Sequence, residues 1–342
     1  TPGSFGTSAW HVAPVALEVL LIIYGGLWLS SLLNRYGANA VVADWLAGVG
    51  LSQERMVLLI VLGLTPFAES VTGFGVGAVI AIPILLAVGL PPVPAAACGL
   101  LGFVAVPWGA LAPGTLIGAQ VGQVDFTDLG LASAAWSLPT YLICGLGALV
   151  TTYGLRRSRK WTGDLVGLGL VLWGAIWSAN HVLGTQLAGA VGSAVAIAVY
   201  LVAATRAERV ALTMPAPVRR ALLPYAALCG MISIGRIAQI LLDTHGFAVL
   251  ARCVGTPACW LVVTCLCVRR LLGHRADGWG GTLASASGAL VKWRPVAIAT
   301  LSYLLLGTWM TSSGMSSSLA DASGRLGSSY LLLAPVIGAV GG

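Results

Sequence analysis

The stretch Thr65-Pro-Phe-Ala-Glu-Ser-Val-Thr-Gly-Phe-Gly-Val-Gly-Ala78 is the most informative part of the chain. Pro66 lacks an amide hydrogen and clashes with the preceding turn, so we expect it to end the helix that arrives from Met56. The three glycines let the backbone bend before a new helix begins near Ala78. The first turn of that helix offers unpaired N–H groups and a partial positive charge. The stretch therefore predicts a discontinuous helix with an anion site at the break.

Glu69 lies within this stretch and is the only acidic residue between Arg55 and Asp125. A carboxyl group isolated among apolar residues can take up and release a proton, which is the property that proton coupling requires. We therefore predict that Glu69 is the proton-coupling residue. The alternatives are a structural glutamate hydrogen-bonded to the broken backbone, or one that lies at the membrane interface.

The composition places this stretch in a membrane protein. Charged residues make up 8% of the chain and hydrophobic residues 58%, whereas soluble domains have about 25% charged residues. Apolar runs long enough to cross a bilayer occur at 14–33, 131–153, 164–183, 186–204, 220–241, 247–268 and 295–315. The net charge of +7 arises from short basic clusters between these runs. We interpret the clusters as orientation signals on the cytoplasmic side and expect no nucleic-acid partner.

Two distant segments resemble each other. Gly26-Leu-Trp-Leu-Ser-Ser31 is similar to Gly307-Thr-Trp-Met-Thr-Ser312, and the basic clusters place the two spans in opposite orientations. Such a pair is typical of inverted-repeat transporters, although a biased composition can also produce it by chance. The predicted fold is an all-α polytopic integral membrane protein, an inverted-repeat secondary transporter with discontinuous (re-entrant) helices.

Other polar or bent segments supply further candidates. The segment from Gly102 to Thr115 carries two prolines and is expected to bend and face the Glu69 stretch, although small residues there also suit helix packing. Arg236 could pair with a substrate carboxylate or lie at the far interface. The predicted substrate-binding residues are Ser70, Thr72, Gly73, Phe74, Gly75, Gly77, Trp108, Gly109, Arg236, Ser313 and Gly314.

These segments, in this order, resemble the L-lactate permease family. The shared features are Phe67, Glu69 and Gly73-Phe-Gly75, followed by an aliphatic segment, the Pro91–Ala97 turn and the bend at Trp108-Gly-Ala110. Ser313-Gly-Met315 and Leu333-Ala-Pro335 are also similar to family segments. The chain departs from the family at Ser70-Val-Thr72 and at Val76-Gly77, positions that bear on substrate choice.

The resemblance implies symport of protons with small 2-hydroxymonocarboxylates such as lactate and glycolate, in a multi-pass protein of the bacterial inner membrane. The expected partners are therefore a small organic anion, protons and the lipid bilayer. We expect no cofactor, metal or enzymatic activity, because HExxH, Gly-x-Ser-x-Gly and P-loop motifs do not occur. A carrier for another organic anion, such as a sulfonate or dicarboxylate, and a passive anion channel are the alternatives.

The expected organisation has three parts. Residues 1–154 form a first transmembrane repeat with the Glu69 hairpin, 155–218 a connecting pair of helices, and 219–342 a second repeat. The chain starts without methionine and stops within an apolar run. We therefore expect the second repeat to continue in a longer protein.

Overall fold

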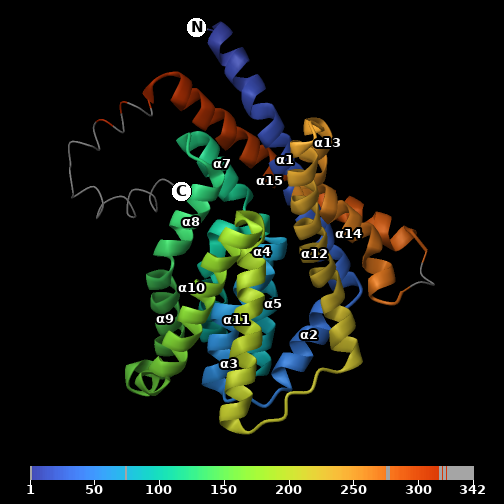
Figure 1. Ribbon diagram of the computed structural model, residues 1–342. Helices are drawn as coiled ribbons and strands as arrows, with labels where there is room; N and C mark the ends of the chain where they lie inside the picture. The colour runs from blue at the N-terminus through green and yellow to red at the C-terminus, as the bar shows by residue number, and fades with distance from the viewer. Residues whose placement is uncertain (1, 74, 275–277, 316–317, 319–320, 322–342) are drawn as a thin grey trace. The chain divides into compact units, whose positions relative to one another are not determined.

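The structure is a computed structural model that describes residues 2–73, 75–274, 278–315, 318 and 321 (Figure 1). These residues form helices joined by short connections, and no strand occurs among them. In chain order the helices are α1 (Pro2–Arg35), α2 (Ala38–Ala47), α3 (Gln53–Leu59), α4 (Thr65–Thr72), α5 (Val76–Ala87), α6 (Pro92–Leu101), α7 (Pro113–Gly122), α8 (Phe126–Trp136), α9 (Leu138–Ser158), α10 (Thr162–Leu183), α11 (Thr185–Glu208), α12 (Ala216–Thr244), α13 (Ala248–Gly255), α14 (Pro257–Leu271) and α15 (Gly280–Ser312). Three other helical turns are η1 (Ile60–Leu64), η2 (Phe103–Leu111) and η3 (Arg159–Trp161).

The chain divides into two compact units. The larger is Glu18–Pro295, and the smaller comprises the described residues within Thr1–Leu17 and Val296–Gly342. The three-part organisation expected from the sequence stays a prediction.

Six helical segments of the described chain are long and apolar enough to cross a membrane, or eight if each of two bent pairs is one span. Most of the predicted runs fall on these segments, but two are not plain spans. The run 131–153 is divided between α8 and α9 at Ser137. The run 247–268 is divided into α13 and α14, which meet at 53° before Pro257. Proline in the first turn of α9 and α14 accounts for both new starts, because it suits a helix N-terminus and disrupts a helix interior.

The helical segment Gln53–Thr72, formed by α3, η1 and α4, lies in the core of the larger unit. Its residues are buried except Gln53, Arg55 and Phe67, which are half-buried. An apolar surface on all sides of a helix requires neighbours on all sides. Most of its neighbours come from α5, α6, α9, α10 and α11.

The expectation that Pro66 ends this helix is wrong. The helix continues to Thr72, and the turn before the proline is a π-helix in which the Thr65 N–H bonds to the Ile60 carbonyl, five residues earlier. The wider π-turn accommodates the proline ring and the lack of an N–H at Pro66, so the helix continues without a break.

Within the larger unit, α1 and α15 run antiparallel. The Trp293 indole N–H donates to the Leu20 carbonyl, and the Trp28 indole donates to the Thr282 carbonyl. The order of the contacts along α15 is therefore the reverse of that along α1. The inverted repeat itself stays a prediction.

Candidate functional site

The helix break lies between Thr72 and Val76. Gly73 has φ 69° and ψ −169°, and Gly75 has φ 81° and ψ 3°. Both φ values are positive, in the region that glycine adopts without the steric cost of a side chain. The new helix, α5, begins at Val76, two residues earlier than expected. Phe74, a predicted substrate residue, lies outside the described residues.

The first turn of α5 binds the Glu69 carboxylate. The Gly75 N–H donates to Oε1 and the Gly77 N–H to Oε2, each at 3.2 Å. The Glu69 residue is only 8% exposed. The amides at the break thus hold the protein's own carboxylate, and a substrate anion site there stays a prediction. The hydrogen-bonded glutamate that the sequence left open as an alternative is the arrangement observed.

The second bent segment, η2, packs against this hairpin. A Cβ atom placed on Gly73 would lie 2.5 Å from the Ala110 Cβ, and one placed on Gly109 would lie 4.0 Å from Glu69 Oε1. α6 and η2 meet at 55°, and Ala110, Leu111 and Ala112 all have positive φ. Non-glycine residues rarely adopt that conformation, so the bend around the hairpin is conformationally costly.

The structure brings together most of the predicted site residues of the first half. The glycines and Glu69 form the hairpin, and the Thr72 hydroxyl donates to the Ala68 carbonyl at 2.6 Å. Ser70 and Trp108 are fully buried next to α11, where a Cβ on Gly189 would meet both side chains.

The remaining predicted residues belong to other segments of the chain. Arg236 is exposed on α12, and its guanidinium donates to Gln239 at 2.9 Å. Ser313 and Gly314 follow α15 and belong to the smaller unit. Their role as substrate residues stays a prediction.

A cavity of about 200 Å³ borders the hairpin helix at Phe67 and Ala68. Its other walls come from α2, α5, α11 and α12, and its lining is nearly all apolar. The cavity could not compensate a carboxylate for the loss of its hydration. The Gly75 and Gly77 amides around Glu69 are therefore better suited than this cavity to bind an anion.

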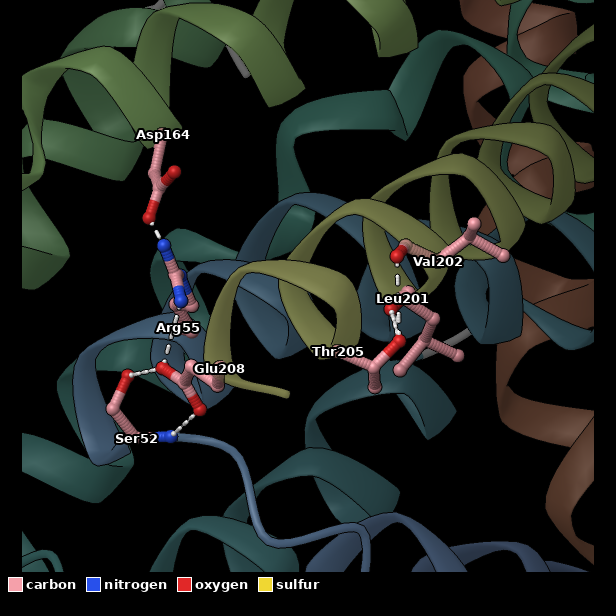
Figure 2. Close-up of polar contacts among 7 residues, drawn as sticks. All are labelled: Ser52, Arg55, Asp164, Leu201, Val202, Thr205 and Glu208. Carbon is pink, nitrogen blue, oxygen red and sulfur yellow. Dashed lines mark hydrogen bonds and ion pairs between the residues drawn. The ribbon is translucent and has the colours of Figure 1, made fainter. Parts of the chain in front are cut away.

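A group of charged side chains, absent from our predicted site, joins four helices at the N-terminal end of α3. Figure 2 shows Arg55 between two carboxylates, with Nε 2.8 Å from Asp164 Oδ2 and Nη1 2.9 Å from Glu208 Oε1. Ser52 donates its hydroxyl and its backbone N–H to Glu208. On α9, Arg157 pairs with Glu54 at 2.6 Å. We name Arg55, Asp164 and Glu208 the Arg55 triad.

We expect Arg55→Met to lower the free energy of unfolding by about 1–3 kcal/mol, because it leaves two carboxylates close together and largely shielded from water. Arg156→Met is the matched control, with an expected loss below about 1 kcal/mol, since Arg156 is exposed on α9 and forms no ion pair with the described residues. Thermal unfolding in detergent measures both changes. Adding Asp164→Asn and Glu208→Gln to Arg55→Met should restore part of the loss, and equal effects of Arg55→Met and Arg156→Met would contradict the assignment.

At the other end of α10 and α11, Asp125 caps the N-terminus of α8. Its carboxylate accepts from the Thr127 and Asp128 N–H groups at 2.7 and 3.2 Å. These hydrogen bonds, that from Asp128 first, hold the pKa of Asp125 below its ordinary value. Gly130 on α8 contacts Thr185, so the Asp125 end of the unit lies opposite the Arg55 triad.

The fold and the site together define a polytopic α-helical membrane protein whose helices break around a buried carboxylate. The family model of L-lactate permease matches residues 7–240. The chain belongs to the L-lactate permease family, which consists of transporters of a small organic anion and not of enzymes. Neither a curated protein nor a solved structure matches the chain.

Proposed function

We propose that the protein transports lactate and related 2-hydroxymonocarboxylates, such as glycolate, together with protons across the plasma membrane of a bacterium. The family match supports lactate as the substrate. The observation that carries the proton coupling is the Glu69 carboxylate on the Gly75 and Gly77 amides. This site binds a carboxylate, and the residue that occupies it can accept a proton.

The mechanism is an exchange of carboxylates on one pair of amides. When Glu69 is ionised, it accepts both hydrogen bonds and its charge is favoured by the α5 N-terminus. A proton on Glu69 neutralises that charge and weakens both bonds. The carboxylate of the substrate then takes the two amides, so that substrate and proton are bound at the same time. When the substrate and the proton are released on the other side of the membrane, Glu69 is ionised again and its two hydrogen bonds form again.

Other groups complete the proposed site. Gly109 lies next to Glu69 Oε1 and, having no side chain, leaves room beside the carboxylate. We assign substrate contacts to Thr72, Gly73 and Phe74 in the hairpin. The second repeat is assigned the rest of the substrate contacts, from Ser313, Gly314 and Arg236. The transporter we propose is built of inverted repeats and works by alternating access.

Uptake of labelled lactate into proteoliposomes tests the proposal. We expect an inward proton gradient to drive accumulation, and a protonophore to abolish it. Accumulation that ignores the gradient would refute proton coupling, and flux that does not saturate would instead support a channel. A competition panel of glycolate, a sulfonate and a dicarboxylate identifies the class of anion, and stronger inhibition by either of the last two would contradict a monocarboxylate carrier.

A further inference from the structure

The apolar cavity beside α4 is not used by the proposed exchange of carboxylates. It has a volume of about 200 Å³, and its walls come from η1, α2, α4, α5, α11, α12 and the connection between α11 and α12. Side chains in protein interiors usually leave few voids larger than a water molecule. A cavity of this size, next to the helix that carries Glu69, therefore calls for an explanation.

The polar side chains of the lining are hydrogen-bonded to other groups of the protein. The Tyr225 hydroxyl donates to Asn39 Oδ1 at 2.7 Å, and the Asn39 amide donates to Asn34 Oδ1 at 2.6 Å. The Trp45 indole N–H donates to the Thr213 carbonyl at 2.8 Å. A water molecule is held in a cavity by about two to four polar partners. The cavity therefore suits an apolar molecule better than it suits water or an anion.

The lining also indicates the size and shape of that molecule. Phe67, Tyr225 and Trp45 contribute aromatic rings, and the ring centroids of Phe67 and Tyr225 lie 5.2 Å apart. Aromatic rings pack well on one another at centroid separations of about 4.5–7 Å. An apolar cavity of about 150 Å³ is large enough to bind benzene. This cavity therefore has room for a benzene ring with a small substituent.

One wall of the cavity is the short helix that carries Glu69. Leu64, Phe67 and Ala68 line the cavity, and Phe67 is the only residue of α4 that is not buried. The π-turn precedes α4 and the glycine break follows it, so the direction of the helix can change at both of its ends. Elsewhere α4 packs against α5, α11 and η2. The cavity is thus the place where α4 has room to move.

We propose that this cavity is a binding site for a small apolar aromatic molecule, of the size of a monosubstituted benzene, and that such a ligand inhibits transport by holding α4 in place. A ligand in the cavity contacts Phe67 and Ala68 and occupies the room into which α4 can move. Alternating access requires the Glu69 hairpin to change its surroundings during each cycle. The inhibition therefore rests on the proposed function, whereas the binding does not.

Fluorobenzene is the probe for binding, because fluorine NMR distinguishes a bound ligand from one dissolved in detergent. Wild type is compared with Ala194→Leu, whose larger side chain occupies part of the cavity, and with Ala203→Leu, the same change at an exposed position of α11 outside the cavity. We expect a saturable bound signal from wild type and from Ala203→Leu. Their Tm should rise by about 2 °C at about ten times the Kd. Ala194→Leu should show neither effect.

Uptake of labelled lactate into proteoliposomes tests the inhibition. The measured quantity is the ratio of the initial rates with and without fluorobenzene, which does not depend on the basal rate of a variant. At a concentration equal to the Kd the site is half occupied, so we expect the rate to fall about twofold in wild type and in Ala203→Leu. In Ala194→Leu the ratio should stay at one.

Several results would overturn the proposal. The site is refuted if wild type gives no bound signal, or if Ala194→Leu gives the same signal as wild type. Displacement of fluorobenzene by pentane but not by toluene would assign the cavity to an aliphatic chain instead. An equal fall in rate in all three proteins would mean that fluorobenzene acts through the bilayer and not through α4. Loss of gradient-driven uptake in wild type without fluorobenzene refutes the proposed function and leaves the binding result unaffected.

Discussion

Glu69→Gln is expected to abolish proton-driven accumulation of lactate and to leave the exchange of lactate across the membrane. Glutamine matches the shape of the carboxyl side chain but cannot carry a proton at neutral pH. It also has one acceptor oxygen instead of two, so it cannot hold the Gly75 and Gly77 amides as the carboxylate does. The amides are then available to the substrate at every pH.

Two assays on proteoliposomes measure this effect. In the first, uptake under an inward proton gradient should fall to the level of liposomes without protein. In the second, labelled lactate outside exchanges with unlabelled lactate inside, and the rate should remain and lose its dependence on pH. Exchange is the informative assay, because a misfolded variant would fail in both.

Glu54→Gln is the matched control, since Glu54 is a buried glutamate at the opposite end of the same helical segment. It pairs with Arg157, far along the helix from the break, and a glutamine can still accept from that guanidinium. We expect it to keep accumulation. If Glu69→Gln still accumulated lactate against its gradient, another residue would have to bind the coupled proton.

The site was predictable where it depends on local sequence. Glycines that follow a long apolar run favour a break, and a single acid within that run indicates a function, because an isolated carboxyl group is costly among apolar side chains. The position of Glu69 relative to Gly75 and Gly77 also follows from the sequence, since the chain turns back within a few residues. The structure accordingly has the Glu69 carboxylate on these two amides, and the binding of a substrate anion there stays a prediction.

The prediction that was wrong and the charged group that was not predicted depend on contacts distant in sequence or on a choice between similar backbone conformations. Pro66 is compatible with a helix end and with a π-turn, and only the fully buried packing around Ile60–Leu64 favours continuation. The Arg55 triad joins residues more than a hundred positions apart. Charges beside apolar spans are equally well explained as orientation signals, so their partners could not be predicted from the sequence.

Gly73→Ala is expected to cost about 3 kcal/mol or more of stability and to abolish uptake, whereas Gly75→Ala should cost only about 1 kcal/mol. At Gly73, φ 69° with ψ −169° is a conformation essentially confined to glycine, and an added Cβ would lie 2.5 Å from the Ala110 Cβ. Gly75 is in the left-handed helical region, and its added Cβ would have no atom within 4 Å.

Thermal unfolding in detergent and lactate uptake distinguish these two contributions. The double variant Gly73→Ala with Ala110→Gly removes the contact between the two Cβ atoms and keeps the unfavourable backbone conformation of residue 73. It is compared with Ala110→Gly alone, because Ala110 has φ 50° and glycine relieves that strain by itself. Adding Gly73→Ala to Ala110→Gly should therefore cost less stability than adding it to wild type. Gly75→Ala leaves α5 and the packing of η2 in place, and we expect it to retain measurable uptake. Equal losses for the two single variants would mean that η2 does not pack on the break as closely as the structure shows. A segment other than η2 would then have to form the wall beside the Glu69 carboxylate.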